Sequence, residues 1–295
     1  MPSSSSVEKP LLVLALGGNA LSPPDIAGSG YIEERCNVQQ TGQRLRTLAQ
    51  RGYRLLVVHG NGPQVGRLLQ ADPGGANLDI HIAQTQGELG YLLLAQLPDS
   101  VCLLTRAVID GEIGPPVKPV GPVLTEKPSD GSPTVAADSG WRTVVPSPRP
   151  VKIPEMAVIG KLLEQSHVIA AGGGGIPVSH DGQPLSGVVD KDWTASLLAR
   201  SLDAAVLVFA TSVDAVYSGF NSREPARHAQ LTSTQARDLI ELGEAAPGSM
   251  APKLESAADF VDATGRDAVI CSLEEIAAAI DDGVGTRIVP SLRVL

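Results

Sequence analysis

The chain of 295 residues is 43% hydrophobic and 19% charged, which excludes a disordered protein and allows a large buried core. Its net charge of -9 argues against nucleic acid or an anionic membrane as a general partner, because both require a broad basic surface. No apolar run approaches the roughly 20 residues that cross a bilayer, and the three scattered cysteines favour reduced thiols in the cytoplasm.

Apolar runs along the chain predict seven strands. Five runs are continuous rather than alternating, which is typical of strands buried on both faces of a parallel sheet. These five are 11–16, 54–59, 100–105, 167–171 and 204–210, and the two weaker ones are 268–271 and 286–289. Helical spacing predicts helices at 32–50, 63–70, 81–96, 154–165, 193–202, 233–242, 252–264 and 273–281. The alternation predicts an α/β fold, with helices on both faces of a mainly parallel sheet.

Residues 110–150 interrupt this alternation. The segment holds nine prolines and too little apolar periodicity for a helix. It predicts a small protruding lid of hairpins, with an irregular surface insertion as the alternative. The whole pattern predicts one domain over residues 10–295, with halves at 10–150 and 151–295, and a disordered tail at 1–9.

Glycine-rich turns follow several of the predicted strands: LALGGNA, VVHGNGPQVG and IAAGGGGIPV. Ligands of open α/β sheets bind beyond the carboxyl ends of the strands, where glycines expose main-chain N–H groups to anions. A single glycine pair usually marks a tight turn, and GGGG alone is compatible with a flexible corner. Three such turns together predict a cradle for phosphate or carboxylate. No turn matches GxxxxGK[ST], and none gives GxGxxG in a strand-turn-helix context, which disfavours Walker-type NTPases and NAD dehydrogenases.

Three lysines stand in constrained surroundings. Lys118 lies among prolines in PPVKPVGP, Lys191 lies between Asp190 and Asp192 at a helix start, and Lys253 lies in the first turn of another helix. A helix N-terminus carries roughly half a positive charge, so Lys253 requires a nearby negative charge. Each lysine alone is compatible with a solvated surface, but together with the glycine turns they predict cations that converge on a polyphosphate. The two aspartates are expected to hold Lys191 or to support a hydrated metal, and holding is preferred for Asp192.

Nine motifs in order carry a resemblance to a known family. They are ALGGNA (15–20), HGNGPQVG (59–66), QGELGY (86–91), KPVGP (118–122), VVPSPRP (144–150), GGGGIPV (172–178), VDKD (189–192), VDAVY (213–217) and APGSMAPK (246–253). On these motifs the chain resembles the carbamate kinases of the amino acid kinase family, from about residue 11 to residue 289. The resemblance implies a three-layer αβα sandwich around a mainly parallel sheet, a small protruding lid subdomain and a homodimer.

The resemblance also implies an activity. It is the reversible transfer of the γ-phosphoryl group of ATP to carbamate, which yields ADP and carbamoyl phosphate and operates in pathways such as arginine breakdown. Mg²⁺ is the implied cofactor, held mainly by nucleotide phosphates and water, with no dedicated metal ligand in the protein.

Individual roles follow from the matched motifs. The resemblance implies that Lys118, Lys191 and Lys253 contact the phosphates and that Asp192 orients lysines. The implied pocket for carbamate and the transferred phosphoryl group consists of Gly17, Gly18, Asn19, Gly60 and Asn61. The implied nucleotide side consists of Asp214, Tyr217, Ser249 and Met250. The first strand has Ala15 and Leu16 where many other amino acid kinases carry a lysine, and the lid lysine is expected to replace it.

The sequence departs from the family pattern at the lid and at the nucleotide side. The segments before Lys118 and at 125–141 are short, Val123-Leu124 replace a common aromatic residue, and two residues are missing before VDKD. SGFNSREP replaces the usual pattern after VDAVY. Two alternatives stay open: a kinase for another small carboxylate or carbamate-like acceptor, and a degenerate nucleotide-binding sensor without turnover. Retention of the three lysines argues against the sensor.

Overall fold

An eight-stranded sheet with the order β14-β16-β15-β11-β1-β2-β9-β3 lies at the centre of the protein. The computed structural model describes residues 9–21, 31–72, 78–129, 131–137, 140–220, 222, 224–246 and 248–291, so residues 1–8 of the tail predicted at 1–9 lie outside it. The strands are β1 Leu11–Leu16, β2 Arg54–His59, β3 Ser100–Leu103, β9 His167–Ala170, β11 Val206–Thr211, β14 Gln230–Thr232, β15 Ala268–Ser272 and β16 Thr286–Val289. All neighbouring pairs are parallel except β15 with β16, which confirms the predicted mainly parallel sheet.

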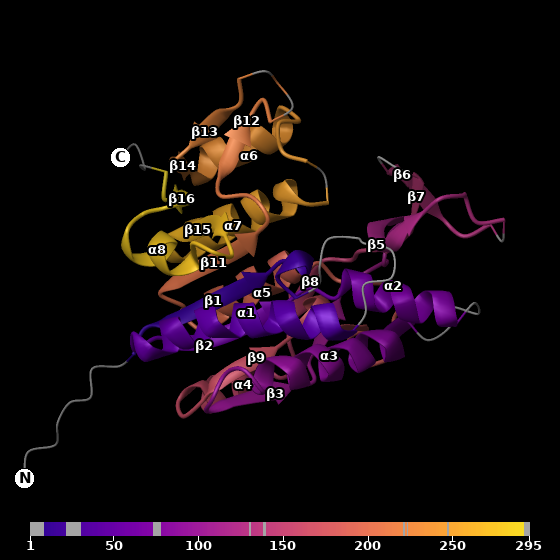
Figure 1. Cartoon of the computed structure of the whole chain (residues 1–295), viewed down its shortest axis with the longest axis horizontal. Helices are drawn as coiled ribbons and strands as arrows, with labels where there is room; N and C mark the ends of the chain where they lie inside the picture. Colours follow the sequence, from indigo (N-terminus) through magenta and orange to yellow (C-terminus); the bar gives the residue numbers. More distant parts are fainter. Residues whose placement is uncertain are drawn as a thin grey trace, which may run out of the picture.

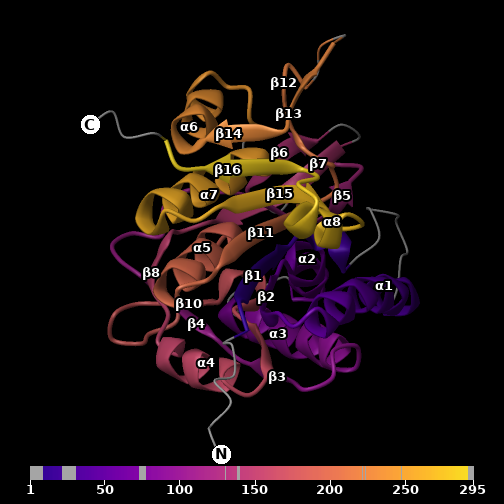
Figure 2. The same cartoon turned by 90° about the vertical axis from the view of Figure 1, so that its left-hand side faces the viewer.

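Helices cover both faces of this sheet (Figures 1 and 2). On one face lie α1 Tyr31–Gln50, α3 Leu78–Leu94 and α8 Ile276–Asp281, and on the other lie α4 Met156–Leu163, α5 Lys191–Ser201, α6 Ser233–Glu241 and α7 Met250–Thr264. Helix α2, Gly62–Ala71, follows β2 and packs on α3. Every predicted helix is present with ends shifted by at most three residues. Among the described residues no helix is both long and apolar enough to cross a bilayer.

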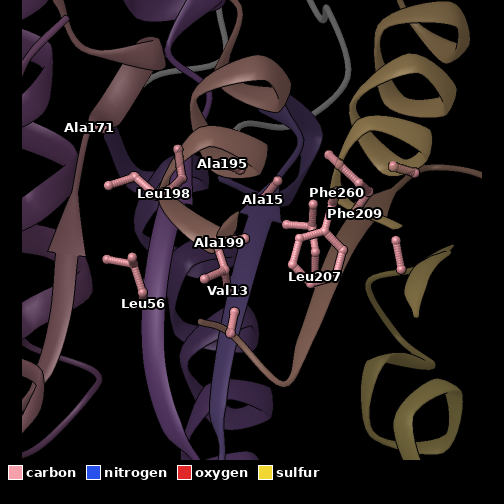
Figure 3. Packing of buried hydrophobic residues seen from close by; sticks show 14 of the residues in the cluster. Val13, Ala15, Leu56, Ala171, Ala195, Leu198, Ala199, Leu207, Phe209 and Phe260 are labelled. Carbon is pink, nitrogen blue, oxygen red and sulfur yellow. The ribbon is translucent and has the colours of Figure 1, made fainter. Parts of the chain in front are cut away.

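Strand β1 shows why its apolar run is continuous. Odd-numbered side chains such as Val13 belong to the core beneath α5 and α7, and even-numbered ones such as Leu14 belong to the core beneath α1 and α3. Figure 3 shows Val13 in the first core together with Phe209 and Phe260. Each fully buried leucine or valine side chain contributes about 1.5–3 kcal/mol to folding. The αβα sandwich therefore follows from strands that are apolar on both sides.

The described residues within 110–150 include strands that project from the rest of the molecule (Figure 1). Strands β5 Pro116–Leu124, β7 Gly140–Pro146 and β6 Thr134–Ala137 make an antiparallel sheet in the order β5-β7-β6, which we call the lid sheet. The lid sheet packs on α2, where a Cβ on Gly66 would lie 1.9 Å from the Cα atom of Gly121. Only glycine permits so close a backbone approach. The motion of this unit as a lid, and the division of the chain into two halves, stay predictions.

The sequence analysis missed several short strands. Strands β4 Arg106–Ile109, β8 Pro150–Lys152 and β10 Ile176–Val178 form a sheet in the order β10-β4-β8, and β12 Val216–Ser218 pairs with β13 Ala226–His228. Runs of three or four residues are too short to show a period, and proline inside a run argues against a strand. Their pairing is therefore decided by neighbouring elements rather than by their own pattern.

Candidate active site

A cavity of about 220 Å³ lies beyond the carboxyl ends of β1, β2 and β9. It is lined by Gly18, Gly60, Asn61, Gly62, Pro63, Lys118, Arg142, Gly173, Asp190, Lys191, Asp192, Gly248 and Lys253. Glycine turns form one wall, the lid sheet forms another, and the starts of α5 and α7 complete it. Four cationic side chains and two carboxylates line the cavity, so its net charge is about two positive. Such a site attracts an anion that carries several negative charges.

Asp192 joins two of the predicted lysines. Its Oδ1 atom lies 3.0 Å from Nζ of Lys191, and its Oδ2 atom accepts a hydrogen bond of 3.1 Å from Nζ of Lys253. Lys253 is only 6% exposed and also donates to the Ser249 carbonyl oxygen at 3.0 Å. The negative charge that faces Lys253 at its helix start is therefore the Asp192 carboxylate. Ser249 stands at the N-cap position of α7, but its side chain makes no capping hydrogen bond.

Asp190 bonds to the start of α5 and to the lysine of the lid sheet. Its Oδ1 atom accepts a hydrogen bond of 2.9 Å from the Asp192 main-chain N–H and caps α5. Its Oδ2 atom accepts a hydrogen bond of 3.2 Å from Nζ of Lys118, which also donates to the Val189 carbonyl oxygen at 2.9 Å. Asp190 thus anchors the lysine of the lid sheet to the start of α5.

The charges of these side chains support one another. Burial alone would raise the pKa of Asp190, but the ammonium groups of Lys118 and Lys191 outweigh it and hold this pKa well below its usual range. Burial likewise opposes the charge of Lys191, yet the carboxylates of Asp192 and Asp190 raise its pKa above the ordinary value. For Lys253 burial dominates and lowers the pKa, although Asp192 opposes the shift. Each of the three lysines therefore lies beside a carboxylate.

The glycine turns are packed together by close contacts. A Cβ on Gly60 would lie 3.3 Å from the N atom of Gly18 and 3.4 Å from Cδ of Lys191. A Cβ on Gly173, which has a φ of +65°, would lie 2.1 Å from Nδ2 of Asn61. The turns after β1, β2 and β9 therefore lie against each other, and side chains larger than hydrogen would displace them.

Gln86 holds the GGGG turn from beneath. This buried side chain donates hydrogen bonds from Nε2 to the carbonyl oxygens of Thr105 at 3.1 Å and Gly172 at 3.0 Å. Its Oε1 atom accepts a bond of 2.9 Å from the Thr105 main-chain N–H. The QGELGY motif thereby connects the ends of β3 and β9.

The buried ring of His59 packs against the same turn. A Cβ on Gly172 would lie 2.4 Å from Cε1 of its ring. Burial lowers the pKa of His59 from 6.5 to about 4, although the bond from its Nδ1 to the Gly60 carbonyl oxygen opposes the shift. His59 is therefore uncharged at neutral pH and does not offer a positive charge to a bound phosphate.

The burial of His59 predicts that the free energy of unfolding depends on pH. Between pH 6.5 and 4 His59 takes up a proton in the unfolded chain but not in the folded protein. The free energy of unfolding is therefore highest above pH 6.5, as far as His59 is concerned, and decreases as the pH falls toward 4. The total change is about 3 kcal/mol, at about 1.4 kcal/mol per pKa unit. Urea unfolding between pH 7 and 4.5 should show a smaller pH slope for His59→Gln than for the wild type, and an unchanged slope for His180→Gln, whose side chain is 65% exposed. Equal slopes for wild type and His59→Gln would contradict the assignment.

None of the four predicted nucleotide residues is among those that line this cavity. The hydroxyl of Tyr217 donates to Asp214 at 3.0 Å, and Nε of Arg227 donates to the same carboxyl group at 3.3 Å. Ser249 and Met250 begin α7 beside the cavity, but neither lines it. The structure thus brings Ser249 and Met250 near the lysines and places the Asp214 group separately.

The predicted acceptor residues divide similarly. Gly18, Gly60 and Asn61 line the cavity, whereas the main-chain N–H of Gly17 donates to the Ala210 carbonyl oxygen at 3.0 Å and holds β1 against β11. The side chain of Asn19 lies outside the described residues.

Arg142 is a cavity residue that sequence reasoning missed. It lies on β7 of the lid sheet and donates from Nη2 to the Gly121 carbonyl oxygen at 2.7 Å and from Nε at 3.2 Å. Arg142 lines the cavity together with Lys118. The only sequence signal was an arginine just before VVPSPRP in the lid.

A larger cavity of about 490 Å³ lies between α2 and the lid sheet. Valine, leucine and proline side chains form most of its wall, and its one charged side chain is the carboxylate of Asp72. It offers no cation to a phosphate, so the smaller cavity is the candidate active site. Among the residues that the structure describes, no group of three or more His, Cys, Asp or Glu side chains is placed to hold a metal ion.

Comparisons with known proteins agree with this geometry. The sequence model of the amino acid kinase family matches residues 10–272. A carbamate kinase of Halobacterium salinarum is 37% identical over 95% of this chain and 98% of its own length, and carbamate kinase 1 of Enterococcus faecium is 38% identical over 93% and 97%. The solved structure of carbamate kinase from Giardia lamblia bound to AMP-PNP superposes with a TM-score of 0.85 and 30% identity, and covers 96% of this chain and 99% of that one.

Proposed function

Because this chain belongs to the amino acid kinase family, we propose that it catalyses reversible phosphoryl transfer between ATP and carbamate, giving ADP and carbamoyl phosphate. The chain is a kinase, that is, a phosphotransferase. The observation that carries the proposal is the 220 Å³ cavity, in which lysines from the lid sheet, α5 and α7 are held by two aspartates beside glycine turns.

The three lysines are the proposed phosphate contacts. Phosphoryl transfer requires little covalent chemistry from a protein, and mainly needs alignment and positive charge on the transferred group. Lys191 and Lys253 are held within 3.1 Å of one carboxylate, so their ammonium groups are fixed before a substrate arrives. Such preorganised charge stabilises the transition state without a reorganisation cost at the moment of reaction. Asp192 is accordingly the orienting residue, as the family resemblance implies.

The acceptor side is the wall formed by the glycine turns and the lid sheet. The main-chain N–H of Gly18 is proposed to donate to a small carboxylate at this wall. The Gly60 N–H already donates to the Leu16 carbonyl oxygen at 3.0 Å, and Nδ2 of Asn61 donates to Oγ1 of Thr85 at 2.8 Å, so these two residues shape the wall. Arg142 adds a guanidinium group, whose planar fork suits a carboxylate or phosphate. Gly17 and Asn19 are proposed to shape this wall by holding the turn after β1.

The nucleotide side is proposed to extend from the start of α7 toward the loop after β11. Ser249 and Met250 border the cavity, and Asp214 with Tyr217 stands at the β11–β12 connection. Arg227, on β13 and two positions after the SGFNSREP segment, pairs with Asp214.

Mg²⁺ is the proposed cofactor, carried in on the nucleotide phosphates. Asp190 and Asp192 are the carboxylates that line the cavity, and each already bonds to lysine. This donor set fits an ion that keeps several waters and takes its other ligands from phosphate, rather than one caged by protein. The ion would neutralise phosphate charge, while the lysines position the transferred group.

A second candidate acceptor is another small carboxylate or carbamate-like acid. The short segments before Lys118 and at 125–141 favour it, because they trim the lid that would cover the acceptor.

The functional unit is proposed to be a homodimer through α3 and β3. Strand β3 is an edge of the central sheet, and nearby apolar side chains are exposed: Ile80 by 50%, Tyr91 by 64% and Leu104 by 54%. A second copy of the chain would cover this apolar face and the unpaired edge together. Sedimentation velocity at micromolar concentration tests this; a species of one chain's mass would contradict it.

The proposed compartment is the cytoplasm. Cys36, Cys102 and Cys271 all lie in described parts of the chain and are free thiols, which suits a reducing environment. Fractionation of the source cells would test this location.

The experiment that tests the function is ATP formation by the purified protein from ADP, Mg²⁺ and carbamoyl phosphate. We expect turnover that a metal chelator abolishes and added Mg²⁺ restores. Acetyl phosphate in place of carbamoyl phosphate separates the acceptors, since ATP from acetyl phosphate alone would support the second candidate. ADP binding without ATP from either donor would favour a nucleotide sensor and overturn the proposal.

A further inference from the structure

We infer that Arg149 is a positioning residue that couples the lid sheet to the two helices whose starts carry the site lysines. The inference rests on the proposed function, because it concerns how those lysines are kept in place. Arg149 is not among the residues that line the cavity, and its hydrogen bonds and ring contact within the described residues are to Glu255, Asp259 and Trp193.

Arg149 connects three elements at the base of the lid sheet. It lies in the segment between β7 and β8. Its Nη1 atom donates to Oε1 of Glu255 at 2.9 Å, and its Nη2 atom donates to Asp259. Both acceptors lie on α7. Its guanidinium carbon stands 5.5 Å from the ring centroid of Trp193 on α5. One side chain therefore contacts α5 and α7 from the base of the lid.

The residues that Arg149 contacts are neighbours of the site residues in the sequence. Trp193 directly follows Asp192, and Glu255 lies two positions after Lys253. The ring Nε1 of Trp193 donates to Oε2 of Glu255 at 3.3 Å, which closes a ring of contacts with Arg149. Because both helices are rigid over one turn, this ring sets the spacing between Asp192 and Lys253.

The backbone between Arg149 and the lid sheet is restricted in its conformation. Prolines at 146, 148 and 150 flank it and restrict the chain to extended conformations. The carbonyl oxygen of Pro146 accepts a bond of 2.8 Å from the Val188 main-chain N–H, in the segment that leads to Asp190. The lid sheet is thus held at two places, by Arg149 at its base and by Lys118 at Asp190. Loss of the first contact is expected to loosen the second.

The ion pair of Arg149 with Glu255 is too exposed to contribute much to the stability of the fold. Its side chain is 47% exposed and that of Glu255 is 39% exposed, and ion pairs of this kind contribute little to folding. A small displacement of catalytic groups, in contrast, strongly reduces a rate that depends on alignment. A positioning role therefore predicts an effect on turnover without a matching loss of stability.

The chain offers a matched control for this role. Arg237 on α6 pairs with Asp259 and with Asp262 of the same helix α7, at 3.0 and 2.6 Å, and its side chain is 38% exposed. Within the described parts of the chain, its hydrogen bonds and ion pairs are to these two aspartates, both on α7. Arg237→Met therefore removes comparable ion pairs from α7 while it leaves the coupling intact.

The test compares Arg149→Met, Arg149→Lys and Arg237→Met in the full-length protein. Methionine keeps the stem that packs on Trp193 and removes the charge. We expect Arg149→Met to lower kcat about tenfold, a fraction of the roughly 10²-fold cost of a 1 Å misplacement. The KM for ADP and the melting temperature should stay near the wild-type values. Arg149→Lys should restore part of kcat, and Arg237→Met should retain the wild-type kcat.

Amide hydrogen exchange of β5 and β7 with ADP and Mg²⁺ present gives a readout independent of the acceptor. We expect faster exchange in Arg149→Met than in Arg237→Met, even if the acceptor is not carbamate or no turnover occurs, so failure of the proposed function stays distinguishable. Wild-type exchange in Arg149→Met would overturn the coupling. An equal loss of kcat in Arg237→Met would overturn it too, since the cause would then be general weakening of α7.

Discussion

Replacing Lys253 with methionine should lower kcat for ATP formation by about 10²- to 10³-fold, which corresponds to about 3–4 kcal/mol of transition-state stabilisation. Lys253 is 6% exposed and bonded to Asp192, so its ammonium group is fixed and poorly hydrated, and its charge acts strongly on an anion in the cavity. Methionine keeps most of the volume and removes the charge. The KM for ADP should change less than kcat, because the charge is proposed to act mainly on the transferred group.

The control for this variant is Lys161→Met. Lys161 lies in the exposed last turn of α4, away from the cavity, and its replacement should leave kcat unchanged. Steady-state kinetics on both variants, with circular dichroism to verify folding, check the expectation. A folded Lys253→Met enzyme within a few-fold of the wild-type kcat would remove Lys253 from the proposed mechanism.

Replacing Gly66 with alanine should both destabilise the protein and impair turnover. The new Cβ would lie 1.9 Å from Cα and 2.2 Å from N of Gly121, and backbone atoms have no alternative rotamer through which to yield. Alanine favours a helix by about 1 kcal/mol over glycine, but overpacking of this severity costs about 3 kcal/mol or more. The lid sheet must move away from α2, and Lys118 lies on β5 only three positions before Gly121. A shift of about 1 Å there is expected to reduce kcat/KM by about 10²-fold.

The matched control is Gly160→Ala in α4. A Cβ on Gly160 would meet Cδ2 of Leu202 at 3.4 Å, an ordinary van der Waals contact. Urea unfolding should show a lowered free energy of unfolding for Gly66→Ala and an equal or higher one for Gly160→Ala, and kinetics should show the loss only in the first variant. Wild-type stability and turnover in Gly66→Ala would mean that the lid sheet does not depend on this contact.

Local patterns in the sequence determined the layers of the fold. The uninterrupted run at 11–16 identified a strand apolar on both sides, and the structure places its alternate residues in two cores. Helical spacing located the eight α-helices of the described residues, because most of them are long enough to repeat an apolar face. The glycine turns and the three lysines were also visible, since glycine and lysine in these surroundings are unusual in any fold.

Short elements were not visible in the same way. Strands β4, β8 and β10 have three or four residues each, and two of them contain proline. They exist because partners from distant segments supply their hydrogen bonds, and no period within three residues can report that.

The sequence by itself therefore determined the α/β class, the mainly parallel sheet and the residue types of the site. Only the tertiary structure decided which charges meet. Asp192 bonds to Lys253, 61 positions later, Asp190 bonds to Lys118, 72 positions earlier, and Arg142 enters the cavity from the lid sheet. The physical reason is that a periodic pattern reports one element's own buried face, whereas contacts between elements depend on strand order and on close approaches such as that of Gly66 to Gly121.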